Sequence, residues 1–270
     1  MSADVTTKKM PVLFVGHGNP MITMSDNSYT RGWAELAKTL PQPKAILAIS
    51  AHWYVPETRV TVIHPLPTIH DFYGFPPELF QVEYPVPGNP ELAEHVADLL
   101  LPDRVDLDGA WGIDHGSWSV LRHMYPQARV PVIQLGINYN LEPGDHYRLG
   151  TKLRELRDNG VLILGSGNIV HNLAGFNWRK PGETPPAWAT DFENWNRRVL
   201  TSGKAGELVD FQSTGTMAKM SVPTPDHYLP LIYAAAQADA NDEVSFPVEG
   251  FDGGTMSMLA VLWTQRNAEE

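Results

Sequence analysis

Apolar and polar positions alternate along the chain in blocks that predict strands separated by helices. Short runs rich in Val, Ile and Leu recur, and stretches with a helical spacing of apolar residues lie between most of them. This alternation is typical of βαβ units in an open α/β sheet. A chain of 270 residues suits one large domain of this kind, 1–270. The predicted strands are 11–15, 44–50, 60–64, 131–137, 161–165 and 258–263.

Capping residues locate the starts of two helices. An Asn-Pro pair begins the helix predicted over 89–101, because Asn suits the N-cap and Pro the first helical position. Thr190 and Glu193 have the spacing of a capping box, which predicts a helix from Thr190 to about Leu200.

Asp226 fits the N-cap of a further helix that continues to Ala235, with His227 in its first turn. The Pro-rich stretches 63–90 and 178–187 are expected to be ordered loops over the strand ends. Loops in this position often carry binding residues.

Three of the apolar runs lead into a short polar turn that contains a histidine. His17 lies in GHGNP, His52 in SAHW and His171 in GSGNIVHN, and His227 follows in PTPDHYLP. Strands that run the same way in an open sheet present their carboxyl ends at one edge, where side chains of separate strands converge. The four histidines therefore predict a mononuclear metal site at that edge.

Each motif alone has a structural alternative. His17 fits a hydrogen-bonded turn histidine, His52 a core histidine beside Trp53, and His227 the start of a capped helix. The stretch 165–171 also fits a phosphate-binding turn, although its spacing matches neither the P-loop nor the dinucleotide fingerprint.

Two further segments carry candidate chemistry. Residues 68–76 combine His70, an acid and the aromatic residues Phe72 and Tyr73, which suits either a wall for an aromatic ligand or a surface loop held by its own aromatics. His115 follows Asp114 at the start of an apolar helix and is either a second proton-transfer group or a histidine beside a helix cap.

Composition narrows the chemistry. The chain has no cysteine, so a metal ion must be held by imidazole or carboxylate. A net charge of -11 argues against nucleic acid or an anionic membrane as partner and favours a small molecule. The N-terminus lacks the apolar segment of a signal peptide and no run is long enough to span a membrane, so we expect a cytoplasmic protein. Residues 1–9 are expected to form a flexible tail.

The motifs together resemble class III (LigB-type) extradiol ring-cleaving dioxygenases, and within them the DOPA 4,5-dioxygenase group. The resemblance implies a single-domain αβα sandwich with a mostly parallel sheet. It also implies a non-haem iron and O2-dependent cleavage of a catechol beside its two hydroxyls, to a ring-opened semialdehyde. The motifs in chain order are GHGNP, SAHW, TIHDFYGFP, DHGSW, GSGNIVHN and PTPDHYLPL.

The resemblance also implies roles for individual residues. His17 and His52 would bind the metal with His227 as third ligand, where many relatives of the wider class have a glutamate. His171 would be the catalytic acid/base or a fourth ligand, and His115 a second proton donor or a substrate-orienting group. Candidates for substrate contacts are His70, Phe72, Tyr73, Trp53 and Tyr228, with Asn19 and Asn168 as lesser ones.

Two other functions fit the same residues. A three-histidine site with an open position also suits a zinc-dependent hydrolase, and Zn(II) binds such ligands tightly even where Fe(II) is the catalytic ion. A protein that keeps the fold without the chemistry would be a metal-free binding module.

Overall fold

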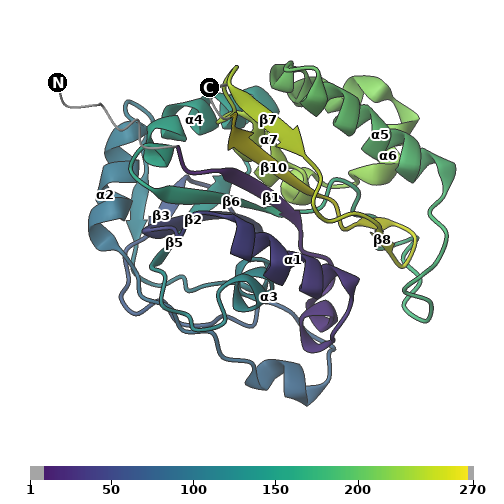
Figure 1. Cartoon of the computed structure of the whole chain (residues 1–270), viewed down its shortest axis with the longest axis horizontal. Helices are drawn as coiled ribbons and strands as arrows, with labels where there is room; N and C mark the ends of the chain where they lie inside the picture. Colours follow the sequence, from purple (N-terminus) through teal and green to yellow (C-terminus); the bar gives the residue numbers. More distant parts are fainter. Residues whose placement is uncertain (1–8, 267–270) are drawn as a thin grey trace.

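The computed structural model describes residues 9–266, which form one large sheet covered by helices and a separate two-stranded ribbon (Figure 1). The order across the large sheet is β4-β3-β5-β2-β6-β1-β10-β7, and β8 pairs with β9 in the ribbon. The strands are β1 (Val12–Gly16), β2 (Ala45–Val55), β3 (Arg59–Thr61), β4 (Asp106–Asp108), β5 (Val132–Asn138), β6 (Val161–Gly167), β7 (Asp242–Ser245), β8 (Phe251–Asp252), β9 (Met256–Ser257) and β10 (Ala260–Gln265).

The centre of the large sheet is parallel. β5, β2, β6 and β1 are parallel neighbours, whereas β10 and β7 extend the sheet antiparallel beyond β1. β3 joins the other side antiparallel to β5 and parallel to β4. The α/β prediction with a mostly parallel sheet is therefore confirmed.

Helices bury both faces of the sheet. Along β1, Val12 and Phe14 point into one core while Leu13 and Val15 point into the other, as the strand period of two requires. The first core is covered by α2 (Pro90–Leu99), α4 (Pro143–Lys152), α5 (Ala187–Thr201), α6 (Thr216–Ser221) and α7 (Leu229–Ala235), and the second by α1 (Ser28–Thr39) and α3 (His115–Met124).

Local signals placed the start of α2 correctly and that of α5 incorrectly. Asn89 caps α2 by accepting a hydrogen bond from the Leu92 N–H at 3.1 Å, as predicted. The capping box predicted at Thr190 is wrong, because α5 already begins at Ala187 and the Thr190 hydroxyl donates to the Ala187 carbonyl.

The N-terminal tail was predicted for residues 1–9, and residues 1–8 lie outside the described residues. The backbone N–H of Lys9 donates to Gln265 Oε1 at 3.0 Å, which ties the start of the described chain to β10. Between residues 9 and 266 there is no helix with the length and apolarity that crossing a bilayer requires.

Candidate metal centre and active site

Parallel strands bring the first site histidine to a shared edge. β2, β6 and β1 are adjacent and parallel, so their carboxyl ends lie together. His17 is the first residue after β1, and its backbone N–H donates to the Gly167 carbonyl at the end of β6 at 3.0 Å. Gly18 has a φ of 71° and turns the chain away from the sheet, a conformation that favours glycine.

His52 reaches the same edge from within a strand. We expected the strand to stop before it, but β2 continues past it to Val55. The register between β2 and β5 shifts between Ile49 and Tyr54, so the segment around His52 is irregular. Irregularities of this kind re-aim a side chain, which here turns the imidazole toward the end of β1.

His115 enters from the other side at the start of α3. Asp114 caps this helix by accepting from the Ser117 N–H at 3.1 Å. Gly116, the second residue of α3, packs so closely that a Cβ atom there would lie 2.9 Å from Cδ2 of His52. Glycine at this position therefore lets the helix start touch the site.

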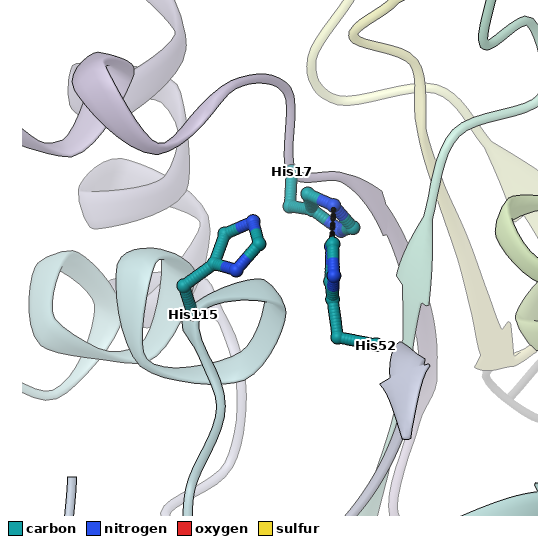
Figure 2. Close-up of side chains that lie close together, drawn as sticks. All are labelled: His17, His52 and His115. Atoms are coloured by element: carbon teal, nitrogen blue, oxygen red, sulfur yellow. Dashed lines mark hydrogen bonds between the residues drawn. The ribbon is translucent and has the colours of Figure 1, made fainter. Parts of the chain in front are cut away.

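The imidazoles of His17, His52 and His115 converge (Figure 2). Each offers one nitrogen, and these three nitrogens lie within 4.8 Å of one another. The Nε2 atoms of His17 and His52 face each other at 3.1 Å. This group could hold a metal ion.

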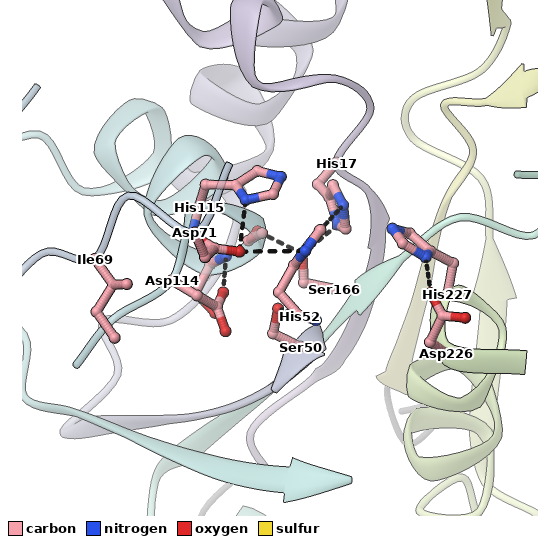
Figure 3. A network of polar contacts seen from close by, with 12 residues as sticks. His17, Ser50, His52, Ile69, Asp71, Asp114, His115, Ser166, Asp226 and His227 are labelled. Carbon is pink, nitrogen blue, oxygen red and sulfur yellow. Dashed lines mark hydrogen bonds and ion pairs between the residues drawn. The ribbon is translucent and has the colours of Figure 1, made fainter. Parts of the chain in front are cut away.

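Polar partners at the Nδ1 atoms orient these rings (Figure 3). The Ser166 hydroxyl donates to the Gly116 carbonyl, so its oxygen accepts from Nδ1 of His17 at 3.0 Å. One carboxylate oxygen of Asp71 lies 2.8 Å from Nδ1 of His115 and 3.2 Å from Nδ1 of His52. Partners of this kind fix the tautomer that leaves Nε2 free to bind a metal.

A fourth histidine, His227, faces the same space. The helix cap predicted for Asp226 is wrong, because its carboxylate bonds Nδ1 of His227, which ends a short 3-10 helix before α7. Burial raises the pKa of Asp226, but its hydrogen bond to His227 helps to lower it to about 2, so it is ionised. The His227 ring centroid lies 5.3 Å from that of His17 and 5.1 Å from that of His52.

The glycines at the carboxyl end of β6 serve chain packing. A Cβ on Gly167 would lie 2.1 Å from the carbonyl oxygen of His227, and one on Gly165 2.5 Å from that of Pro230. The Asn168 N–H donates to the same His227 carbonyl at 2.9 Å. This turn, for which phosphate binding was an alternative, instead holds the His227 segment against the sheet.

His171 lies in a loop beyond the end of β6. Its backbone forms an isolated antiparallel bridge to Met256 and donates to the Ser221 carbonyl at 2.8 Å. Its ring stacks on His227 with the ring centroids 3.5 Å apart. His171 therefore lies next to the site, with its ring against the face of the His227 ring.

Burial keeps the imidazoles of His17, His52 and His171 uncharged. It lowers the pKa of His17 and His52 well below the usual value, and the neighbouring histidines lower it further. Burial and then the neighbour His227 lower the pKa of His171 to about 2. Neutral imidazole is the form that binds a metal or accepts a proton.

A cavity of about 740 Å³ opens over the histidines. Phe75 and Trp178 approach across it with ring centroids 6.2 Å apart, so the two predicted loops meet over the strand ends. Tyr73 is 92% exposed at the mouth. The aromatic residues of the wall are Phe72, Tyr73, Phe75, Phe176 and Trp178.

Three predicted substrate contacts lie elsewhere. Trp53 is buried, stacks on Trp111 and does not line the cavity. Tyr228 is 0% exposed, and its hydroxyl donates to Asn196 Oδ1 at 2.6 Å inside the core. His70 bonds the Val82 carbonyl through Nε2 and does not line the cavity, whereas Phe72 and Tyr73 do.

The comparisons with known proteins agree with this geometry. Residues 12–259 match the family model described as the catalytic LigB subunit of aromatic ring-opening dioxygenase. The chain belongs to the LigB family. This LigB-family enzyme is 45% identical over 264 residues to "4,5-DOPA dioxygenase extradiol" of Escherichia coli, covering 95% of this chain and 96% of the relative. It is 38% identical over 258 residues to the Beta vulgaris protein of the same name, covering 93% and 95%.

The fold of the LigB-family chain also matches a solved structure. The crystal structure of an uncharacterized protein from Escherichia coli K12 superposes with a TM-score of 0.81 at 41% identity, covering 94% of this chain and 99% of that one. The resemblance read from the motifs is therefore confirmed, and the protein is a ring-cleaving dioxygenase.

The donor set of this LigB-family enzyme fits a metal ion. Nδ1 of His17 bonds Ser166, and Nδ1 of His52 lies 3.2 Å from a carboxylate oxygen of Asp71. With the protons on these Nδ1 atoms, the Nε2 atoms of both rings carry lone pairs, yet they face each other at 3.1 Å. Two lone pairs repel at that distance, and a cation between or beside them removes the repulsion.

Sequence reasoning missed several residues of the dioxygenase site. Asp71 was seen only as an acid in an aromatic loop, although it orients two histidines. Asp252 also lines the cavity and accepts from Asn19 Nδ2 at 2.7 Å. These partners are far apart in the sequence, so no local spacing could have indicated them.

Proposed function

We propose that this enzyme cleaves the ring of L-DOPA or a closely related catechol at the 4,5 position, using O2 and Fe(II). The supporting observation is the group of converging histidines that lines a cavity with aromatic walls, in which burial lowers the pKa of His17 and His52. Relatives that are 45% and 38% identical carry the name 4,5-DOPA dioxygenase extradiol.

The proposed ligands are His17, His52 and His227. The His227 ring is nearly equidistant from the other two, at 5.3 and 5.1 Å between centroids. The His115 ring is closer to His52, at 3.8 Å, than to His17, at 5.7 Å. We therefore give His115 the role of a proton donor or substrate-orienting group, although its Nε2 could also reach a metal.

His17, His52 and His227 would hold Fe(II), which would supply the redox chemistry that the reaction with O2 needs, whereas Zn(II) has no redox chemistry. His171 is stacked on His227 beside the proposed ligands, so its imidazole is placed to exchange a proton with a catechol hydroxyl. Asp71 holds Nδ1 of His115, which leaves Nε2 of that ring directed at the substrate. The loop aromatics exclude water above the reacting ring.

Oxygen uptake tests the proposal. The protein is reconstituted with Fe(II) without air and then given L-DOPA and O2, with absorbance followed for a yellow ring-opened product. We expect one O2 consumed for each L-DOPA. A filled iron site with no uptake across a panel of catechols would reject the proposal and favour the zinc-dependent hydrolase.

Metal content tests the ligand assignment. We expect His17→Gln, His52→Gln and His227→Gln to retain less than about a tenth of the iron, because each removes one of three ligands. His115→Gln should retain nearly all of it. The reverse result for His115 and His227 would exchange their roles.

A further inference from the structure

A carboxylate lies in the wall of the cavity apart from the histidines. Asp252 ends β8, is 4% exposed and lines the cavity. Its Oδ2 atom accepts from Asn19 Nδ2 at 2.7 Å, and Asn19 also lines the cavity, two residues after His17. Asp71 and Asp226 orient histidines, whereas Asp252 contacts none in the hydrogen bonds and ion pairs of residues 9–266.

The strand ladder places Asp252 at a defined distance from the reacting centre. Asp252 pairs with Met256 in the ribbon, and Met256 in turn bridges to His171. Neighbouring strands are about 4.8 Å apart, so the backbone of Asp252 lies two such spacings, roughly 10 Å, from that of His171. Because Asp252 and the histidines line the same cavity, a catechol held at the histidines shares that cavity with the Asp252 carboxylate.

The charge of the cavity wall is negative. Its acidic residues are Asp71 and Asp252, and no lysine or arginine is among the described residues that line it. Arg179 and Lys180 are close in sequence to the wall but do not line the cavity, and Lys180 Nζ pairs with Glu183 at 3.1 Å. A cation is therefore favoured at the wall, and a second anion is not.

Asp252 has no cationic partner of its own. Among the ion pairs of residues 9–266 none includes this carboxylate, so Asn19 compensates its charge only in part. Burial raises the pKa of Asp252, while the hydrogen bond from Asn19 and one from the Gly253 amide favour the ionised form. A buried carboxylate without a counter-ion gains when a ligand supplies one.

We propose that Asp252, positioned by Asn19, binds the ammonium group of the substrate side chain and makes the enzyme selective for catechols that carry an amine. The aromatic residues of the wall add to this preference, because cations are attracted to ring faces. The proposal rests on the proposed function, since it names the substrate class of the same site. Recognition of the carboxylate of an amino-acid substrate is not part of it.

Four catechols that differ only in the side chain test the selectivity of the wild-type enzyme. L-DOPA carries both charged groups, dopamine the amine alone, 3-(3,4-dihydroxyphenyl)propionate the carboxylate alone, and 4-ethylcatechol neither. We expect kcat/KM for dopamine to exceed that for 4-ethylcatechol at least about tenfold, the low end for a hydrogen bond to a charged group. A preference for the propionate over dopamine would overturn the proposal whether or not any variant folds.

Substitution then assigns the preference to one residue. Asp252→Asn keeps the shape and removes the charge, and we expect the dopamine to 4-ethylcatechol ratio to fall to nearly one. Asp26→Asn is the matched control, because Asp26 is exposed and pairs with Arg31 away from the cavity. A folded Asp252→Asn enzyme that keeps the wild-type ratio would reject the role of Asp252.

Binding separates this proposal from the proposed function. The dissociation constants of dopamine and 3-(3,4-dihydroxyphenyl)propionate are measured by calorimetry on Zn(II)-loaded protein without air, where no turnover occurs. If no catechol is cleaved under any condition but dopamine still binds at least about tenfold more tightly, the proposed function fails and the role of Asp252 stands. If ring opening occurs and the two bind equally, the role of Asp252 fails and the proposed function stands.

Discussion

The orientation of the site histidines depends on bonds to Nδ1 from partners in different parts of the chain. Ser166 holds His17, Asp226 holds His227, and Asp71 is shared by the remaining two. Within residues 9–266 no side chain hydrogen-bonds the ring of His171, which is held by stacking on His227. A ring held in this way can turn toward a substrate, as an acid/base group must.

His171→Gln should separate chemistry from metal binding. We expect near-normal iron content and turnover reduced at least about 10²-fold, the low end for loss of a general base. Metal analysis and oxygen uptake on the same sample measure both. His95→Gln on α2 is the matched control and should behave as wild type. If iron is lost together with activity, His171 is a ligand instead.

At the scale of elements, the site depends on how closely α7 and the short helix before it approach β6. The carbonyl of His227 accepts from the Asn168 N–H, and Gly167 leaves room for that contact. On the outer side, α7 packs on α4, where Nδ1 of His146 lies 3.0 Å from the Tyr233 hydroxyl. Both contacts are buried, so changing either one should alter the geometry of the site or lower the stability of the fold.

Gly167→Ala should displace His227. A Cβ there would lie 2.1 Å from the His227 carbonyl oxygen, so the backbone must move. We expect the free energy of unfolding in urea to fall by about 1–3 kcal/mol, as for other overpacked positions, and iron content to fall with it. Gly144→Ala, where a Cβ meets nothing within 4 Å, should lower neither the free energy of unfolding nor the iron content. Normal iron binding in a folded Gly167→Ala protein would contradict this account.

His146 should make stability depend on pH. Burial lowers its pKa to about 4, so between that value and about 6.5 the unfolded chain binds a proton that the folded chain does not. Stability from this residue is therefore complete above the unfolded pKa and lost as pH falls. From pH 7 to pH 5 we expect a loss of about 2 kcal/mol.

Urea unfolding of His146→Gln at these two pH values isolates that contribution. The variant should lose about 2 kcal/mol less than wild type over the interval. His64→Gln, at an exposed position, is the control and should follow wild type. Equal losses in wild type and His146→Gln would show that His146 does not cause the acid sensitivity.

At the scale of the whole molecule, the proposed ligands join distant parts of the chain. His17 follows β1, His52 lies in β2 and His227 precedes α7 near the other end of the sequence. The sheet brings them together, with the Nε2 atoms of His17 and His52 3.1 Å apart and the ring centroids of His17 and His227 5.3 Å apart. A metal ion at this point would act as a cross-link that binds only the folded state.

Chelation should therefore destabilise the protein as a whole. With free metal a thousandfold above its Kd, binding adds about 4 kcal/mol, which corresponds to a Tm higher by roughly 10 °C. Thermal unfolding before and after treatment with a chelator measures this shift. Zn(II) should restore the Tm without oxygen uptake, and Fe(II) should restore both. A Tm that chelation leaves unchanged would argue against a resident metal.

The sequence by itself determined the elements and the edge on which the site lies. Runs of Val, Ile and Leu located the central strands, and Asn89 marked the start of α2, because these signals act between near neighbours. His17, His52 and His171 each follow or end such a run, so parallel pairing alone assigns them to one edge. The family motifs then indicated ring-opening chemistry.

Only the tertiary structure decided which side chains meet. Asp71 lies 44 positions from His115, and Asn19 lies 233 positions from Asp252, so neither contact has a local signal. Tyr228 follows His227 directly, yet points into the core on the far side of its short helix. The direction in which a side chain points and the distance between two segments are set by how the helices pack on the sheet. That packing depends on the whole chain at once.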